Sequence, residues 1–456
     1  RTSRLAFSPN RDGRMDRLSV AVSTTEPTSV HATLKNRRGV SLRTWRRSTE
    51  ARHHSFEWRG RARGRRLGDG RYRIKVTATD QVGLRANASR KVIVDTKPPR
   101  LKLRRISPKV LRKGARVTVV YALRDRSRRS RLRLQLKGDN VKRTFDAGRR
   151  FRGRGKIRRR LVLRGGRVLP TRAYRIRMVA KDDAGNRGRS RTRPWRVLRA
   201  ARARVYTRLQ RTGRKVALTF DDCYDTGAWR AILKSLRRQR ARGTFFCNGV
   251  HVAAHPRLAR RTVRWGNAIG SHTPDHALLT SLPAAATERR LRQDIGIWWR
   301  VARTTPAPYF RPPYGAYNQA TLSGAGAAAY SRVVLWDVDT QDWRRPGAGA
   351  IAARATSARP GSIVLMHAIG QTAAAMPSIL RGLDNRSLRP VTLPQLFHAA
   401  RGSRSLRTSA DARSSWRGLY AAQRAAGFGP APPFGNPKRV DEAAHRSSPS
   451  ASRDRP

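Results

Sequence analysis

Acidic residues, cysteines and long apolar runs are all scarce in this chain of 456 residues. No run of 18 or more apolar residues appears, so the sequence predicts no membrane-spanning helix. The two cysteines, Cys223 and Cys247, cannot build a framework of several disulfides, and their number does not indicate the cellular compartment. The chain starts at Arg1 without an initiating Met or a recognisable signal peptide, and the expectation is that a targeting segment has been removed.

The shortage of acidic residues produces an extreme net charge. The chain has 102 Lys and Arg against 27 Asp and Glu, which gives a formal net charge of +75. Residues 216–400 hold 24 basic and 10 acidic residues, whereas the rest of the chain holds 78 and 17. Flanks with this excess favour polyanionic partners, namely nucleic acid, wall polymers or anionic lipid. The alternative is a compositional drift to Arg with solvated charge, because net charge determines association and not fold.

The patterns in residues 1–97 and 98–200 are those of β-structure. Apolar and polar residues alternate in Leu18–Val22 and Tyr72–Asp80, with Gly and Asn turns around them, which indicates a β-sandwich. The stretch Tyr174–Asp182 repeats Tyr72–Asp80 at an offset of 102 residues. Residues 98–200 are therefore predicted to form a second sandwich of the same kind.

The opening of the first predicted sandwich reads Phe7-Ser-Pro-Asn-Arg-Asp-Gly. This stretch resembles immunoglobulin-like modules of bacterial surface proteins, which implies a spacer or binding role for both sandwiches. The oxygens of Asn10, Asp12 and Asp16 are candidate Ca²⁺ ligands. A plain polar turn is favoured here, because three oxygens fall short of the 6–8 that Ca²⁺ takes.

Residues 216–400 alternate short apolar stretches with helix-like ones, which indicates a parallel α/β sheet or barrel. A basic linker, 201–215, precedes this region, and a tail rich in Ser, Arg, Pro and Ala, 401–456, follows it and is predicted to be disordered. The candidate strands are Val216–Phe220, Gly243–Phe246, Ala268–Gly270, Tyr309–Arg311, Val333–Val338 and Ser362–His367. Nearly all end in polar or His residues, and the C-terminal strand ends form the active face of α/β barrels.

Residues suited to catalysis follow these strands in five clusters. Asp221 and Asp222 end the first strand, where alternating side-chain directions let one carboxylate hold a cation and the other handle a proton. His272 and His276 follow the third strand. Two imidazoles and one carboxylate leave the open position that a catalytic zinc needs. The other clusters are Phe310–Gly315, Asp339–Trp343 and Leu365–His367.

The five clusters, in this order, resemble the motifs of the polysaccharide deacetylases, the NodB-homology or carbohydrate esterase family 4 group. The resemblance covers residues 216–400 and implies a distorted (β/α) barrel. It also implies metal-dependent hydrolysis of an acetyl group on a sugar, most often N-acetylglucosamine in peptidoglycan or a chitin-like polymer. Zn²⁺ is the expected metal, with Co²⁺ or Ni²⁺ as alternatives. A secreted or wall-associated location is expected.

The resemblance also implies a role for each residue of the site. Asp221 is similar to the catalytic base of the family, and His367 to the general acid. Asp222, His272 and His276 resemble the metal ligands. The remaining roles are Arg311 holding the base, the Tyr314 backbone N–H as oxyanion donor, Asp342 tuning the acid, and Trp343 and Pro313 in the substrate groove.

One position departs from the family pattern. Gly-Pro usually follows the paired Asp, whereas this chain has Cys223-Tyr224. Gly lets the backbone bend freely and Cys does so less. The sequence therefore does not decide whether the substrate can reach the site past this rim. Cys247 ends the next candidate strand, and neighbouring strands lie about 4.8 Å apart. A disulfide is therefore sterically reasonable if the two cysteines are in register, and two packed free thiols are the alternative.

Two other functional hypotheses remain open at this stage. The first keeps the enzyme and changes the bond, as an O-acetyl esterase on xylan or another glycan. The second is a surface protein that binds glycans or polyanions and whose barrel no longer catalyses. The intact acid, base and ligand candidates argue against the second hypothesis.

Overall fold

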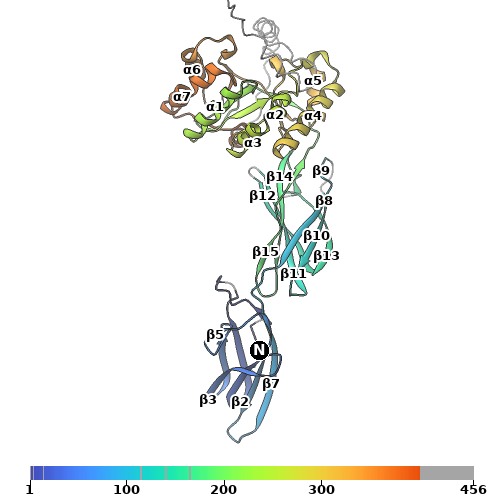
Figure 1. Ribbon diagram of the computed structural model, residues 1–456, viewed down its shortest axis with the longest axis vertical. Helices are drawn as coiled ribbons and strands as arrows, with labels where there is room; N and C mark the ends of the chain where they lie inside the picture. The colour runs from blue at the N-terminus through green and yellow to red at the C-terminus, as the bar shows by residue number, and fades with distance from the viewer. Residues whose placement is uncertain are drawn as a thin grey trace, which may run out of the picture. The chain divides into compact units, whose positions relative to one another are not determined.

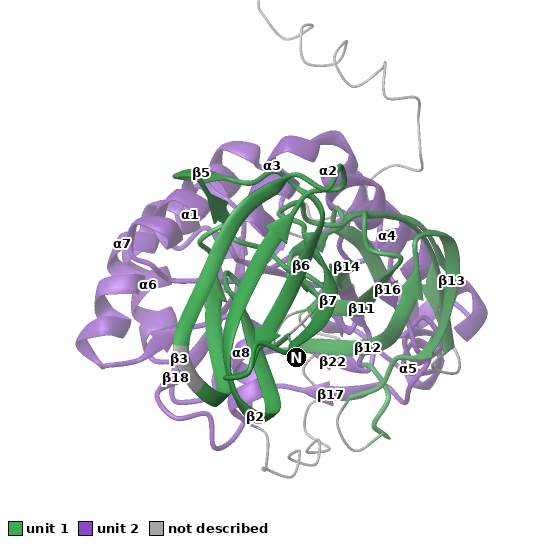
Figure 2. Ribbon diagram, turned by 90° about the horizontal axis from the view of Figure 1, so that it is seen from below, with its two compact units in different colours: residues 1–169, 174–195 green, residues 170–173, 196–456 purple. Residues whose placement is uncertain are grey.

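The computed structural model describes residues 2–400 except 4, 14, 113–115, 139–140 and 164–165, and it leaves the side chains of residues 49 and 50 undescribed. The tail predicted to be disordered, 401–456, lies outside the described residues. The chain divides into two compact units (Figure 2), which are residues 1–169 with 174–195, and residues 170–173 with 196–456.

The first part of the first unit is one five-stranded sheet (Figure 1), with the order β1-β7-β6-β2-β3. Alternate residues along β2 and β6 are buried, and they pack around Trp58 and Phe7, whose rings lie 5.0 Å apart. The strands are β1 (Ala6–Phe7), β2 (Leu18–Lys35), β3 (Ser41–Trp58), β6 (Gly70–Thr79) and β7 (Arg85–Val94), with a separate pair of β4 (Arg61–Ala62) and β5 (Arg65–Arg66).

Two further sheets follow in the same unit. One has the order β13-β10-β8, and the other has the order β12-β11-β14-β16-β9 with β15 paired to β14. The strands are β8 (Arg100–Ser107), β9 (Val110–Leu111), β10 (Arg116–Arg124), β11 (Arg129–Gly138), β12 (Val141–Phe151), β13 (Gly153–Arg160), β14 (Arg172–Lys181), β15 (Arg187–Arg189) and β16 (Arg193–Val197). The N-terminal half is thus rich in sheet. Its immunoglobulin-like character and the domain boundaries stay predictions.

In the second unit, parallel strands surround the apolar strand β18 (Lys215–Asp222). One sheet has the order β20-β19-β18-β24-β23, and another has the order β17-β22-β21. A parallel bridge between Ser271 and Phe310 connects the end of β20 to β21. The remaining strands are β17 (Arg204–Tyr206), β19 (Thr244–Cys247), β20 (Ala268–Ile269), β21 (Tyr309–Phe310), β22 (Arg332–Val334), β23 (Val338–Asp339), β24 (Ile363–His367) and β25 (Arg389–Pro390).

Helices alternate with these strands and cover them (Figure 1). Helix α1 starts after Asp225, whose carboxylate accepts a hydrogen bond from the backbone N–H of Ala228 and caps the helix. The helices are α1 (Thr226–Arg238), α2 (Gly249–Ala254), α3 (Pro256–Arg264), α4 (Ala284–Ala302), α5 (Gln319–Ala327), α6 (Ala348–Thr356), α7 (Gly370–Asn385) and α8 (Leu393–Ala399), with short 3₁₀ turns at η2 (Leu279–Ser281), η3 (Pro313–Gly315) and η4 (Asp342–Arg344).

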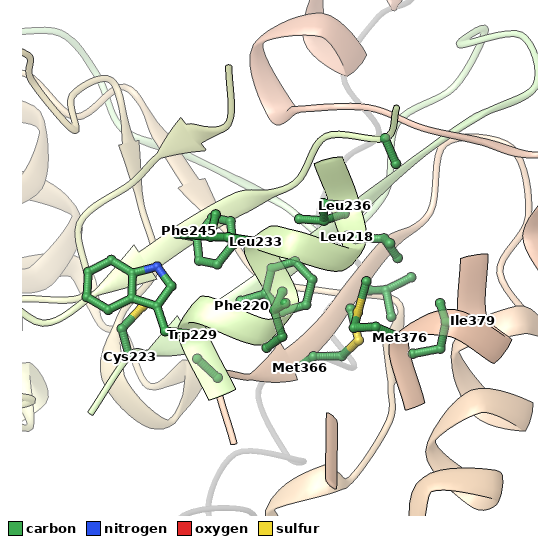
Figure 3. Packing of buried hydrophobic residues seen from close by; sticks show 14 of the residues in the cluster. Leu218, Phe220, Cys223, Trp229, Leu233, Leu236, Phe245, Met366, Met376 and Ile379 are labelled. Atoms are coloured by element: carbon green, nitrogen blue, oxygen red, sulfur yellow. The ribbon is translucent and has the colours of Figure 1, made fainter. Parts of the chain in front are cut away.

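The core of this unit lies between the central strands and their helices (Figure 3). Leu233 and Leu236 of α1 pack toward Phe220 and Phe245, and all four side chains are fully buried. The rings of Phe220 and Phe245 stack with centroids 4.9 Å apart. This packing fixes β18 beneath its two terminal aspartates. No helix among the described residues is long and apolar enough to cross a membrane.

The strand prediction for Val333–Val338 is wrong in one respect. The stretch forms two strands, β22 and β23, with an interruption from Leu335 to Asp337. At the interruption the carbonyls of Val334 and Leu335 accept hydrogen bonds from the Arg311 side chain. The Asp337 carboxylate accepts the backbone N–H of Ile363. Side chains thus add to the backbone bonds that Leu335 and Asp337 make with Tyr206 and Ile363, and the apolar pattern does not reveal this.

Two other features bear on the sequence analysis. Within the stretch assigned to a basic linker, β17 pairs in parallel with β22. Cys223 and Cys247 form a disulfide, with Cα atoms 5.0 Å apart. The register places Asp222 opposite Cys247, so Cys223 lies one residue beyond the paired strands.

The disulfide lies beside an unusual piece of backbone. Asp222 and Cys223 both have φ of 66°, in the left-handed region that favours Gly. Cys223 thus adopts a backbone conformation that Gly takes more readily, at some cost in strain. The disulfide closes a separation of 24 residues. In the chain-entropy model a loop of this size contributes about 3.5 kcal/mol to stability, which is of the same order as the strain in two such residues.

Candidate functional site

A cleft lies at the C-terminal ends of the parallel strands. Strand β18 brings two carboxylates to this edge and β24 brings His367, since the register pairs Asp221 with His367. The loops after β20 and β21 supply the paired His and the Pro-rich segment. The cleft is lined by Asp221, Asp222, His272, His276, Pro312, Tyr314, Gly315, Trp336, Trp343, Leu365 and His367.

Three of these side chains have the arrangement of metal ligands. Oδ1 of Asp222 lies 3.5 Å from Nε2 of His272 and 3.5 Å from Nε2 of His276. Ligand atoms about 2.0–2.1 Å from a tetrahedral zinc are themselves about 3.4 Å apart, so the spacing fits such an ion. Oδ1 of Asp222 is also buried and accepts no hydrogen bond within the described part of the chain.

The protonation of the two imidazoles suits the same role. Nδ1 of His272 donates to the backbone carbonyl of Arg311 at 2.9 Å, which leaves the Nε2 lone pair directed to Asp222. Burial lowers the pKa of His272 to about 3 and also lowers the pKa of His276. Both rings are therefore neutral near pH 7, the form that binds zinc.

The second carboxylate, Asp221, is held apart from this group by a buried arginine. Nη1 of Arg311 donates to Oδ1 of Asp221 at 2.8 Å and to Oγ1 of Thr219 at 2.9 Å. The other oxygen of Asp221 lies 3.8 Å from Nε2 of His272. Burial raises the pKa of Asp221 to about 6, although the charge of Arg311 opposes this rise. Asp221 is thus a carboxylate of increased basicity beside the metal-ligand group.

His367 forms a second acid–base pair with Asp342. Nδ1 of His367 bonds to Oδ1 of Asp342 at 2.7 Å, and Oδ2 accepts the backbone N–H of His367 at 2.6 Å. The hydroxyl of Thr372 donates to the same Oδ2. Burial alone would lower the pKa of His367, but Asp342 and the two cleft aspartates together raise it to about 10. His367 is therefore protonated at neutral pH.

Of the remaining site residues predicted from the sequence, some line the cleft and others lie behind the lining residues. Tyr314 and Trp343 both line it, and Tyr314 adopts a positive φ of 61°. Arg311 and Asp342 lie behind the lining residues and act on them through the bonds described above. Pro313 is not a lining residue, and the proline at the wall is Pro312. The 3₁₀ turn that begins at Pro313 buries its ring in the protein.

Two residues near the site were not predicted from the sequence. Trp336 lines the cleft from the interruption between β22 and β23, which the predicted continuous strand concealed. Asp294 of α4 is fully buried, and burial raises its pKa to about 8. Asp294 lies on the apolar face formed by Leu291 and Trp298, and that mismatch is the signal that could have revealed it.

The sequence model of the polysaccharide deacetylase family matches residues 208–333. The chitooligosaccharide deacetylase of Rhizobium leguminosarum bv. trifolii is 34% identical over 198 residues, which cover 40% of this chain and 91% of that protein. The chain belongs to the polysaccharide deacetylase family.

Other members of the family match over a similar stretch. The peptidoglycan-N-acetylglucosamine deacetylase PgdA of Listeria monocytogenes is 33% identical over 193 residues, or 41% of this chain. The match spans only 40% of the length of PgdA. A solved structure of a family 4 carbohydrate esterase from Streptomyces lividans, in complex with acetate, has 33% identity and a TM-score of 0.37. It covers 39% of this chain and 91% of that chain.

The metal-ligand group leads to a first prediction. Replacing Asp222→Ala or His272→Ala removes one of the three candidate ligands, and if the group binds a divalent metal, each variant should lose zinc supplied to the protein. The control His398→Ala changes an exposed histidine outside the cleft and should keep it. Each protein is dialysed against a buffer that contains zinc, and its zinc content is then measured by elemental analysis. Retention of one zinc per chain by both ligand variants would contradict the assignment.

Proposed function

We propose that this chain is a zinc-dependent deacetylase that removes acetyl groups from N-acetylglucosamine units of a polysaccharide. The observation that supports this most strongly is the placement of a basic carboxylate and a protonated histidine in one cleft with three metal-type ligands. The family membership and the names of the relatives agree with it. Those relatives include peptidoglycan-N-acetylglucosamine and chitooligosaccharide deacetylases. Peptidoglycan and chitin-like polymers are accordingly the proposed substrates.

The chemistry requires activation of water and of the leaving amine. A divalent metal at Asp222, His272 and His276 would polarise the amide carbonyl and make water more acidic. Asp221, held by Arg311, is positioned to take a proton from the attacking water. The water oxygen adds to the carbonyl carbon, and the carbon–nitrogen bond then breaks to release acetate.

The opposite side of the cleft serves the leaving group. His367 gives its proton to the departing nitrogen, which leaves as a neutral amine. Asp342 keeps that proton on the ring near neutral pH through the 2.7 Å bond to Nδ1. The Tyr314 backbone N–H is the proposed donor to the developing oxyanion, an interaction worth roughly 3–4 kcal/mol in comparable sites.

The walls of the cleft suit a sugar ring. Trp336 and Trp343 offer apolar ring surface on which a sugar face can pack. The alternative of an O-acetyl esterase uses the same residues on an ester, and only the substrate test below distinguishes the two reactions.

Acetate release tests the proposed activity and its base together. The zinc-loaded protein should release acetate from peptidoglycan or chitooligosaccharide faster than from acetylxylan. Asp221→Asn should lower turnover by roughly 10²–10⁴-fold, the usual contribution of a positioned base, while zinc stays bound. Asp384→Asn, an exposed position at the end of α7, is the control and should keep full activity. Near-normal turnover of Asp221→Asn would show that another group is the base.

The His367–Asp342 pair predicts a change in pH dependence. A general acid works only while protonated, so activity falls as the pH rises through its pKa. In Asp342→Asn the ring loses the carboxylate that raises its pKa, and the alkaline limb of the kcat/KM profile should move to lower pH. Asp384→Asn is the control, since its carboxylate is exposed at the end of α7 and makes no contact with His367. An unchanged limb in Asp342→Asn would rule out His367 as the acid.

We further propose that the basic flanks hold the enzyme on anionic cell-wall polymers outside the cell. The flanks carry 78 basic and 17 acidic residues, and attraction of this kind has little sugar specificity. The protein should sediment with wall material at low salt. It should be released as salt rises, because the screening length falls to about 8 Å near physiological ionic strength. Failure to bind wall at any salt concentration would leave the charge without this role.

A further inference from the structure

A second cluster of carboxylates lies in the first unit. Asp95 follows β7, Asp125 follows β10, and Asp182 follows β14. One oxygen from each carboxylate lies within 4.8 Å of the other two. Asp95 is 1% exposed and Asp182 is 5% exposed, while Asp125 is half-buried. Three acids thus meet in the interior of an otherwise strongly basic chain.

Neighbouring groups satisfy some of these oxygens. Asp182 accepts the backbone N–H of Asn186 at 2.8 Å on one oxygen and the Asn186 side-chain amide at 2.9 Å on the other. Oδ2 of Asp125 accepts the hydroxyl of Ser130 at 2.7 Å. These contacts orient the carboxylates without supplying a positive charge.

Asp95 is the exception in this cluster. Its Oδ1 accepts the backbone N–H of Lys97 at 3.2 Å. Its Oδ2 is buried and has no hydrogen-bond partner in the described part of the chain. An unpaired buried carboxylate oxygen is costly, and two further acids within 4.8 Å increase that cost.

A protein cation is near but is directed elsewhere. Nη1 of Arg126 lies 3.6 Å from Oδ2 of Asp69, and its side chain is 48% exposed. Its charge does not offset burial, because burial raises the pKa of Asp95 and of Asp125, and raises that of Asp182 to about 7. In the described part of the chain, no basic side chain therefore forms an ion pair with these three carboxylates.

We propose that Asp95, Asp125 and Asp182 bind a calcium ion. All three ligands are carboxylates, the hard oxygen donors that Ca²⁺ takes, whereas zinc prefers nitrogen and sulfur. At Ca–O distances of about 2.3–2.6 Å, oxygens on opposite sides of the ion are about 4.6–5.2 Å apart. The limit of 4.8 Å between the ligand atoms is compatible with that span. Three carboxylates supply up to six oxygen ligands when each carboxylate binds the ion through both of its oxygens.

The site is specific to one copy of the sequence repeat. Asp80 occupies the position that corresponds to Asp182, 102 residues earlier. Its Oδ1 accepts the backbone N–H groups of Val82 at 3.1 Å and Leu84 at 2.8 Å, as in an ordinary polar turn. A bound ion would connect the end of β7 to the loops after β10 and β14, and so would stabilise this unit. The inference is independent of the proposed catalytic function.

The test uses the full-length protein, stripped of metals on a chelating resin and resupplied with one equivalent of zinc. Calorimetric titration with CaCl₂ up to about 10 mM covers the affinities of extracellular calcium modules. We expect one Ca²⁺ per chain, weaker binding of Mg²⁺, and a higher Tm in Ca²⁺. His272→Ala should bind Ca²⁺ as the unsubstituted chain does.

Variants locate the ion. Asp182→Asn keeps the size of the side chain and should weaken Ca²⁺ binding at least tenfold, whereas the matched Asp80→Asn should leave it unchanged. Asp125→Asn, at the half-buried position, provides the same test if Asp182→Asn fails to fold. The proposal is overturned if the unsubstituted protein binds no Ca²⁺ in this range. It is also overturned if the folded cluster variants bind as tightly as Asp80→Asn.

Discussion

The buried ion pair between Arg311 and Asp221 is the interaction on which the site depends. A guanidinium with no exposure would be very costly alone, but four hydrogen bonds hold it, to Asp221, Thr219 and the carbonyls of Val334 and Leu335. The same side chain occupies the interruption between β22 and β23. One arginine thus binds the carbonyls at the interruption between β22 and β23 and also holds one oxygen of Asp221, while the other oxygen lies 3.8 Å from Nε2 of His272. This arrangement gives two adjacent carboxylates different chemical environments.

Strained backbone surrounds this pair. Asp222, Cys223, Thr273, His276 and Tyr314 all have positive φ. Such conformations persist only where the surrounding structure enforces them. Here the enforcement comes from the packed core beneath β18 and from the disulfide to β19. At Cys223 the bend is held covalently by the disulfide to Cys247.

Much of the catalytic unit could be predicted from the sequence, because its information is local. Short apolar runs located the parallel strands, and the polar residues that follow them identified the edge where the site lies. The features that the sequence did not predict depend on contacts between residues far apart in the chain. The division of Val333–Val338 depends on a side chain more than 20 residues away, and the choice of Pro312 over Pro313 depends on a 3₁₀ turn. The Asp95 cluster joins residues separated by up to 87 positions, which no local pattern reports.

The central claim is that Asp222, His272 and His276 hold the metal while Asp221 stays outside its ligand set. X-ray absorption at the zinc edge of the zinc-loaded protein tests this directly. The account predicts two imidazole nitrogens at about 2.0–2.1 Å with oxygens completing the shell, and the same spectrum in Asp221→Asn. A shell with fewer than two imidazoles, a sulfur at about 2.3 Å, or a ligand lost in Asp221→Asn would contradict it.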